Sequence, residues 1–334
     1  MVANLQSKNP EIGTVSFQCT VCGKCCNSPP LLSVPELFHH ENRFVGSLGL
    51  RRVRRHKIGE LLPAADSRYA LTPDDEKLLN DLAAMQLYKT DKFKHLGEYD
   101  FSIMTQALDY EAENKCPALG ADQHCTIQHD RKPTVCSLVP FDSLYPDSLQ
   151  NIVLLNRNFA ENCIFKGEKA DYPIIIKDRQ VVSRPYQSAL ELRRKDLQSE
   201  KRYWGNAVFA MLEMQVFSQS AEIAKIPQDN GLLLLPLVPV LMVLAEISEK
   251  CQARCLQYID SQIKLIDLKI AQAIARKTVA DKPITQQFRF IKSKYQLLRP
   301  QLTDAPKKPQ FLSADRHTAD IVQAVEDYLE LKTD

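Results

Sequence analysis

The first half of the chain is crowded with cysteine, and this feature constrains the fold more than any other. Eight of the 10 cysteines lie within residues 19–163, and the other two are Cys251 and Cys255. Residues 1–17 contain no apolar run of signal-peptide length, so we expect a cytoplasmic protein. Thiols in that compartment stay reduced, which favours metal binding over a disulfide framework.

The densest part of this pattern is C-x2-C-x2-C-C, formed by Cys19, Cys22, Cys25 and Cys26. A tight turn with two thiolates three positions apart can place both sulfurs on one metal. Gly23 follows the second cysteine, and its freedom to adopt positive φ lets backbone N–H groups point at sulfur. Adjacent side chains on extended backbone point to opposite sides, so we expect Cys25 and Cys26 to ligate in two directions.

Four further cysteines complete a set of eight candidate metal ligands. They are Cys116, Cys125, Cys136 and Cys163. Eight thiolates can hold two zinc ions, two cubane clusters, or one of each. Because adjacent cysteines should diverge, we assign one site to Cys19, Cys22, Cys25 and Cys116, and the other to Cys26, Cys125, Cys136 and Cys163. His124 and His129 flank Cys125, and we expect them to stay outside both ligand sets.

The choice between iron and zinc stays open at this point. The run C-x2-C-x2-C has the spacing of bacterial ferredoxins, which favours an iron–sulfur cluster of the [4Fe-4S] type. Those proteins carry a fourth cysteine after three intervening residues. It is missing from this chain, because Pro29 occupies that position. The alternative is a pair of zinc ions that hold a loop-rich region folded without doing chemistry.

Composition excludes several common enzyme classes. The chain has only 10 glycines, and their positions contain no G-x-G-x-x-G, no P-loop and no nucleophile elbow. The formal net charge is +2, which supplies no strong field for nucleic acid or anionic membranes. The basic run 51–57 therefore predicts a solvated helical face or a partner patch. The apolar run 232–245 contains two prolines and is too short to span a bilayer.

Periodicity predicts a fold that is mostly α, with a small loop-rich α+β cysteine-cluster region and long helices in the C-terminal half. Capping patterns at Ser33 and Thr72 predict helix starts, the second of a helix over 73–89. Short strands are expected at 152–155, 174–176 and 181–182, the last two joined by a hairpin. Long helices are expected at 187–226, 237–277 and 284–298, followed by a Pro-marked linker and a docking helix with apolar residues at 321, 325, 328 and 329.

This pattern divides the chain into three parts. We predict a cysteine-cluster metal-binding domain over 1–185, a helical domain over 186–300, and a linker with a C-terminal docking helix over 301–334. Within the helical domain, Cys251 and Cys255 share a face with Ile247, Ile259 and Ile263. We interpret these two cysteines as small buried residues rather than as a metal-binding pair.

The cysteine motifs, taken in order, carry a family resemblance. C-x2-C-x2-C-C is followed by C-P-x-L from Cys116, C-x-I from Cys125, R-x-P-x-x-C ending at Cys136, and Pro140-Phe141. This order resembles the YkgJ-type CxxCxxCC cysteine cluster family, described as a zinc- or iron-chelating domain, and is distantly similar to flagellin lysine-N-methylase. The resemblance covers residues 15–170. The chain departs from the family's usual adjacent Arg-Pro pair by one inserted residue, Lys132, between Arg131 and Pro133. The resemblance implies metal or iron–sulfur binding by the eight cysteines.

Two functions follow from the sequence. The favoured one is a metal- or cluster-binding protein whose helical half docks a protein partner, in electron transfer or metal handling. The alternative is a cluster-dependent enzyme that modifies protein side chains, such as a protein lysine N-methylase. The C-x3-C-x2-C motif of radical enzymes is missing, because the third position after Cys22 and Cys26 is Pro29. We therefore assign no catalytic residue, and no small-molecule substrate.

Overall fold

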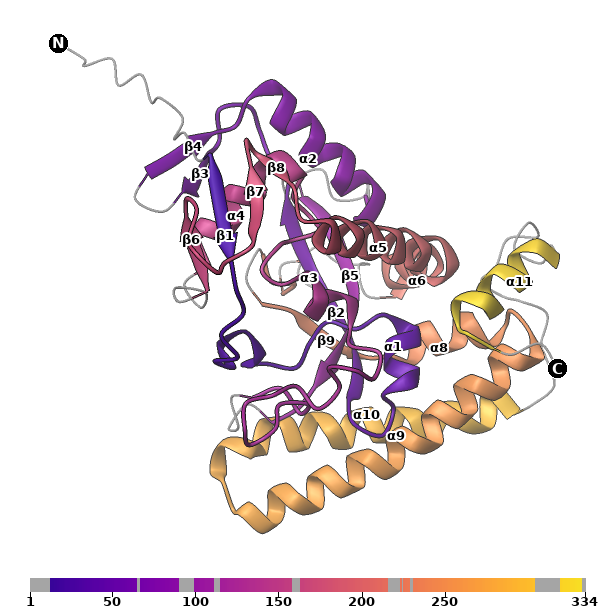
Figure 1. Cartoon of the computed structure of the whole chain (residues 1–334). Coiled ribbons are helices and arrows are strands. Elements are labelled where there is room, and N and C mark those ends of the chain that lie inside the picture. The colour runs from indigo at the N-terminus through magenta and orange to yellow at the C-terminus, as the bar shows by residue number, and fades with distance from the viewer. Residues whose placement is uncertain are drawn as a thin grey trace. The chain divides into compact units, whose positions relative to one another are not determined.

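Figure 1 shows the computed structural model of the chain, which describes residues 13–64, 67–89, 99–110, 115–157, 163–215, 223, 225–228, 231–303 and 319–331. The chain divides into two compact units, each assembled from separated segments. Unit 1 comprises Met1–Cys25, Arg55–Gln86 and Gly120–Asp196, and unit 2 comprises Cys26–Arg54, Leu87–Leu119 and Leu197–Asp334. The boundaries expected near residues 185 and 300 stay a prediction, and each unit is described by itself below.

A four-stranded antiparallel sheet forms one half of unit 1. Its strand order is β6 (Ile164–Lys166), β1 (Thr14–Phe17), β7 (Ile174–Lys177), β8 (Gln180–Val181). Apolar residues of β1, β7 and β8 pack on helices α3 (Thr134–Leu138) and α5 (Arg184–Glu200) in one core cluster. The hairpin expected between residues 176 and 181 is confirmed, and Asp178 and Arg179 take the left-handed conformation that two-residue hairpin turns require.

The other half of unit 1 is a two-stranded sheet covered by helices. Strands β3 (Leu61–Ala64) and β4 (Ser67–Ala70) pair, and their apolar residues pack against α2 (Pro73–Gln86) and α4 (Gln150–Leu155), which follows a short turn η4 (Asp147–Leu149). The predicted helix over 73–89 is confirmed apart from its last turn. The strand predicted over 152–155 is wrong, since these residues lie in α4; a short apolar run does not distinguish a strand from a buried helical segment.

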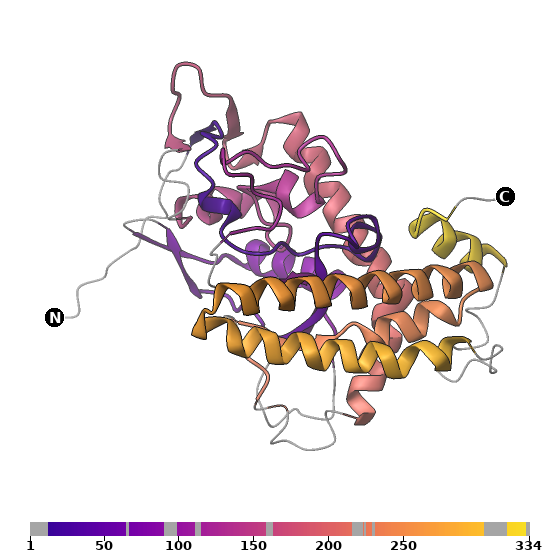
Figure 2. The ribbon, with the colours of Figure 1, turned by 90° about the horizontal axis from the view of Figure 1, so that it is seen from below.

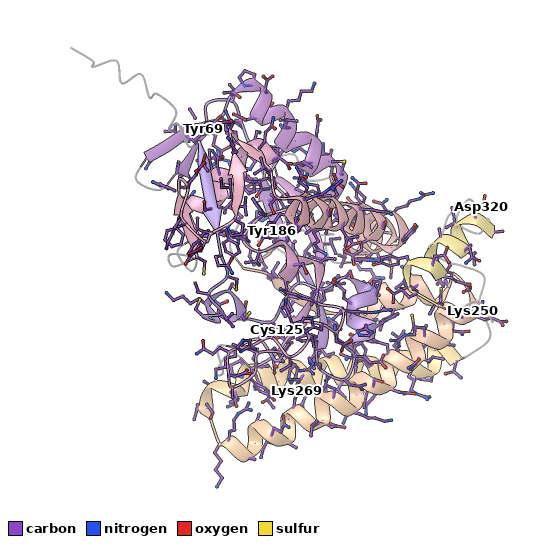
Figure 3. All side chains as sticks on the ribbon, viewed as in Figure 1. Tyr69, Cys125, Tyr186, Lys250, Lys269 and Asp320 are labelled. Carbon is purple, nitrogen blue, oxygen red and sulfur yellow. The ribbon has the colours of Figure 1, made fainter. Side chains whose placement is uncertain are left out.

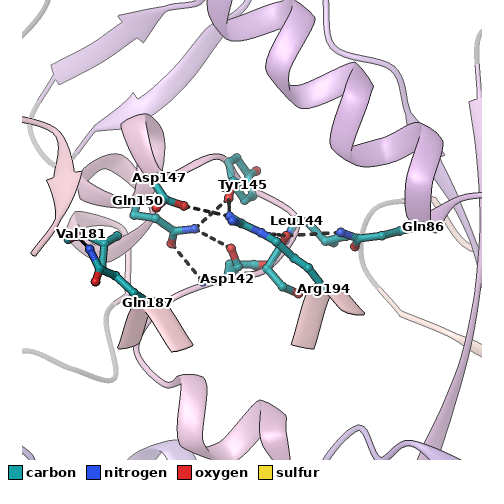
Figure 4. A network of polar contacts seen from close by, with 10 residues as sticks. Gln86, Asp142, Leu144, Tyr145, Asp147, Gln150, Val181, Gln187 and Arg194 are labelled. Carbon is teal, nitrogen blue, oxygen red and sulfur yellow. Dashed lines mark hydrogen bonds and ion pairs between the residues drawn. The ribbon is translucent and has the colours of Figure 1, made fainter. Parts of the chain in front are cut away.

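The loop that leads from α3 to η4 is fixed by side chains (Figure 4). The amide group of Gln150 accepts a hydrogen bond from the Asp142 N–H at 3.0 Å and donates to the carbonyl oxygens of Asp142 and Tyr145. Arg194 of α5 donates to the carbonyl of Tyr145 and pairs with Asp147 at 3.0 Å. Because these donors meet backbone carbonyls that no strand or helix satisfies, the loop is held to α5 and α4.

Asp75 anchors the start of α2 and gives the first testable prediction. Its carboxylate accepts hydrogen bonds from Tyr69 and Thr72 at 2.7 Å each and pairs with Arg179 at 3.1 Å. Burial opposes ionisation, but these partners outweigh it and lower the pKa of Asp75. Its stabilisation is present above the ordinary pKa of about 4 and is lost as pH falls through the lower folded pKa.

We expect Asp75→Asn to lower the free energy of unfolding by about 2–3 kcal/mol at neutral pH, because an amide cannot accept all of these donors. The matched control is Asp74→Asn, which changes an exposed carboxylate one residue away and should cost below about 1 kcal/mol. Urea unfolding of both variants measures the difference, and equal losses would show that the Asp75 contacts contribute nothing special.

Unit 2 is built on a three-stranded antiparallel sheet of order β5, β2, β9. Strands β2 (Val45–Arg54) and β5 (Tyr99–Leu108) pair over ten residues, and β9 (Leu233–Pro236) pairs with the middle of β2. The basic run 51–57 was expected on a helix. This is wrong for residues 51–54, which form the end of strand β2. Arg52 is buried and donates a hydrogen bond to the carbonyl of Ile226 at 3.0 Å, so its side chain is part of the interior of unit 2.

The other described elements that lie wholly within unit 2 are helical. They are α1 (Val34–His39), the π-helical turn η6 (Lys201–Gly205), α6 (Asn206–Gln215), α8 (Val238–Ala245), α9 (Glu249–Arg276), the 3-10 turn η7 (Val279–Asp281), α10 (Lys282–Thr303) and α11 (Ala319–Tyr328). The capping box at Ser33 is confirmed. Helices α9 and α10 lie side by side (Figure 2), with ion pairs from Arg299 to Asp260 and from Lys292 to Asp267. The helix α11 buries Val325 and Leu329, as its apolar stripe predicts.

The expectation of a mostly α fold with a loop-rich cysteine region is wrong. Three antiparallel sheets make the chain a mixed α+β protein, and β9 lies in the half expected to be helical only. The helix predicted over 187–226 is divided among α5, η6 and α6, and part of its end lies outside the described residues, as does most of the predicted linker after Pro300. Among the helices that the structure describes, none is long and apolar enough to cross a membrane.

Candidate metal centre

The turn that carries the first cysteines has an unusual backbone. Val21 has φ 53° and Gly23 has φ 69°, so two left-handed residues flank Cys22. A β-branched residue in this region is rare, and such strain is concentrated at functional sites. Gly23 turns the chain so that the backbone N–H of Lys24 donates to the Cys22 sulfur, and this hydrogen bond is the largest cause of a lowered pKa for that thiol. The role predicted for Gly23 is confirmed.

Two side chains reinforce this effect at Cys22. The Thr20 hydroxyl and the Cys163 thiol both form hydrogen bonds to the Cys22 sulfur and lower its pKa. Thr20 Oγ1 also lies 3.2 Å from the Cys163 sulfur, so one hydroxyl serves both thiols. Burial and the charge of Cys25 act in the opposite direction without reversing the shift. Cys22 therefore forms a thiolate more readily than an ordinary cysteine.

The β1–β6 pair brings Cys163 to this turn. Phe17 of β1 pairs with Ile164 of β6, and the Gln18 N–H donates to the Cys163 carbonyl at 3.0 Å. The chain then runs from Gln18 into the cysteine turn, while Cys163 stands immediately before β6. Residues 141 positions apart in sequence (163 − 22) are thus held together by the antiparallel register of two short strands.

This contact bears on the predicted ligand sets. The sequence hypothesis placed Cys22 and Cys163 in different sites, whereas the structure places the two thiols within hydrogen-bond distance; which metal each would bind stays a prediction. The premise for that division fails, because Lys24–Cys26 forms a 3-10 turn rather than extended backbone. Successive side chains of a 3-10 turn are still rotated by about 120°, so Cys25 and Cys26 continue to point in different directions.

The other cysteines of unit 1 are Cys19, Cys25, Cys125 and Cys136. Cys19 and Cys25 are exposed, whereas Cys125 and Cys136 are half-buried. Cys125 lies in a turn and Cys136 in α3. Among the described cysteines of this unit, no three sulfurs lie within 4.8 Å of one another. The structure thus brings Cys22 and Cys163 together and leaves the roles of the other four as predictions.

A cluster of aromatic rings lies near the exposed Cys19. Tyr186 of α5, labelled in Figure 3, packs its ring against Phe17 and Phe141 at centroid distances of 6.1 and 5.0 Å. Burial, with a smaller contribution from the charge of Cys19, raises the pKa of Tyr186 to about 12. This hydroxyl stays protonated at neutral pH. Sequence reasoning missed Tyr186 and also missed Thr20 beside Cys22 and Cys163. The only sequence signal for Thr20 was its place inside the first C-x2-C.

Cys26 and Cys116 belong to unit 2 and form a pair of their own. The Cys116 N–H donates to the carbonyl oxygen of Cys26 at 2.8 Å, which brings the two backbones together. Both residues are half-buried. The sequence hypothesis placed them in different sites, and this backbone contact does not test their role as ligands, which stays a prediction.

Cys251 and Cys255 are core residues, as the apolar stripe predicts. Both are buried in α9 with no exposed surface. Burial raises the pKa of Cys251 to about 11 and raises that of Cys255 further. Thiols in this state are poor metal ligands at neutral pH, because a metal binds the thiolate.

The donor set at the turn suits a soft metal. Cys22 offers a thiolate at low cost and is half-buried, and the buried Cys163 lies beside it. No family model, no curated protein and no solved structure matches the chain. The resemblance to the CxxCxxCC family therefore rests on the sequence motifs alone.

Thiol reactivity gives the second prediction. In metal-free, reduced protein at pH 7, we expect iodoacetamide to alkylate Cys22 at least about tenfold faster than Cys251, because only the thiolate reacts and the pKa of Cys22 is lowered while that of Cys251 is about 11. Peptide mass spectrometry over time measures both rates in one sample. Comparable rates would mean that the hydrogen bonds at Cys22 do not stabilise its thiolate.

Proposed function

We propose that this protein binds a thiolate-ligated metal centre through the cysteines of unit 1, and that the centre is an iron–sulfur cluster rather than zinc. The observation that carries the proposal is the Cys22 thiol, activated by a backbone N–H and a hydroxyl and held beside Cys163. A metal binds the thiolate, so a thiol whose pKa is already lowered gives up its proton to a metal at a smaller cost. Cys19, Cys25, Cys125 and Cys136 are the further ligands that we propose from this unit.

The preference for a cluster has two supports. The spacing C-x2-C-x2-C is that of ferredoxin ligand runs. Hydrogen bonds from N–H and O–H groups to ligand sulfurs are one of the means by which proteins set cluster potentials, and Cys22 receives both kinds. When bound, a cluster would supply one-electron redox chemistry. The chain's own part is to present thiolates, orient them and donate hydrogen bonds to them.

We further propose that the protein acts in the cytoplasm, in electron transfer or metal handling with a protein partner. A reducing compartment keeps the exposed Cys19 and Cys25 thiols from forming disulfides. Helix α10 of unit 2 offers Phe290 and Leu297, which are 49% and 60% exposed and lie seven positions apart on one face. Exposed apolar side chains on one helical face suit contact with another protein.

Visible absorption of anaerobically purified protein tests this proposal. We expect a broad charge-transfer band that bleaches when dithionite is added. A colourless protein that contains zinc would contradict the cluster. Methylation of lysines in a protein substrate, dependent on S-adenosylmethionine and on the cluster, would replace the electron-transfer role with the enzymatic one.

A further inference from the structure

We propose that Thr20 is a positioning residue of the metal centre, whose hydroxyl holds Cys22 and Cys163 in place and raises the reduction potential of the cluster. This inference rests on the proposed function. Thr20 stands between two candidate ligands in sequence, Cys19 and Cys22, and its Oγ1 lies 3.2 Å from the sulfur of a third, Cys163. The same hydroxyl hydrogen-bonds to Cys22.

The direction of these hydrogen bonds follows from the chemistry of the ligands. Between a hydroxyl and a protonated thiol, either atom can donate. A metal-bound thiolate has no proton, so in the loaded protein the Thr20 hydroxyl must donate and the sulfurs must accept. A hydroxyl has one proton, so the two sulfurs share it. The side chain thereby links the turn at Cys22 to the start of β6 at Cys163.

The backbone limits where this hydroxyl can go. On one side, Gln18 is held to Cys163 by a backbone hydrogen bond of 3.0 Å. On the other side, Val21 is fixed in the left-handed conformation at φ 53°. Threonine itself is β-branched and has few χ1 rotamers. The hydroxyl is therefore placed by the fold, although the residue is exposed to solvent.

Donation to a ligand thiolate has a defined electrostatic effect. Reduction adds an electron to a cluster that thiolates already make negative, so a hydrogen-bond donor stabilises the reduced form more than the oxidised form. Removal of the donor should lower the reduction potential. It should also weaken metal retention, because loss of a group that hydrogen-bonds to a metal ligand typically lowers metal affinity by about 10–100-fold.

Two substitutions separate the hydroxyl from the shape of the side chain. Thr20→Val keeps the branched shape without the hydroxyl, and Thr20→Ser keeps the hydroxyl. Thr303→Val, on the exposed end of α10, is the control for a threonine that bonds only to a backbone carbonyl. Iron and sulfide content, the reduction potential and the rate of iron loss to a chelator are measured on each anaerobic protein.

We expect Thr20→Val to have a lower reduction potential than the wild type and to lose iron about tenfold faster, with Thr20→Ser and Thr303→Val close to the wild type. A Thr20→Val protein that never retains a cluster, while Thr20→Ser does, also supports the hydroxyl's role. Wild-type potential and retention in Thr20→Val would overturn this inference and leave the proposed function intact. A wild-type protein without bound metal would overturn both, and a zinc-loaded one would also overturn both, because zinc has no reduction potential for the hydroxyl to raise.

Discussion

We expect Cys22→Ser and Cys163→Ser each to remove most of the metal from the anaerobically purified protein. The expected loss of affinity is about tenfold or more, because a serine hydroxyl stays protonated at neutral pH and cannot replace a thiolate. Both variants should behave alike, since the two thiols adjoin through hydrogen bonds and a shared threonine. Metal content relative to protein measures the effect.

The matched control for these variants is Cys251→Ser. Cys251 is buried in α9 with a raised pKa of about 11, so it should leave the metal content unchanged. Far-UV circular dichroism shows whether each variant is folded. A folded Cys22→Ser protein with wild-type metal content would remove Cys22 from the centre, and loss of metal in Cys251→Ser would extend the centre into α9.

Removal of the metal should loosen the β1–β6 pair and leave the α9–α10 pair of unit 2 unchanged. A centre that joins Cys22 to Cys163 fastens the two strands where Gln18 meets Cys163. Metal binding of this kind contributes folding free energy of about 10 kcal/mol or more in small metal sites. By contrast, α9 and α10 are held by buried apolar residues, including Ile259, Phe288 and Tyr295.

Hydrogen exchange before and after anaerobic treatment with a chelator measures this difference. We expect amide protection to fall in residues 14–17 and 164–166 and to persist in 249–276 and 282–303. Equal loss of protection in all four segments would show that the metal supports the whole chain. Unchanged protection at the two strands would show that the metal does not fasten them.

Local chemistry made part of the centre predictable from sequence. Gly23 was expected to take positive φ and turn a backbone N–H toward sulfur, and it does so at 69° through Lys24. The capping box at Ser33 and the hairpin at residues 177–180 are likewise set by neighbouring residues. Each of these features depends on a few consecutive positions, where residue type and backbone conformation are directly linked.

Long-range pairing was not predictable in the same way. The proximity of Cys22 and Cys163 depends on the register of β1 and β6, two strands of four and three residues that carry little pattern. Strand β2 was missed because Gly46, Gly49 and three arginines hide its alternation, and its partner β5 (Tyr99–Leu108) lies far along the chain. Such pairing is decided by tertiary packing, which a local window does not contain.

Elemental analysis decides whether the cysteine turn of unit 1 holds an iron–sulfur cluster. The protein is purified without oxygen, and its iron, acid-labile sulfide and zinc are measured relative to protein. We predict iron and sulfide in equal amounts with little zinc, and loss of both in Cys22→Ser. Zinc without sulfide, or a protein free of all three, would contradict it.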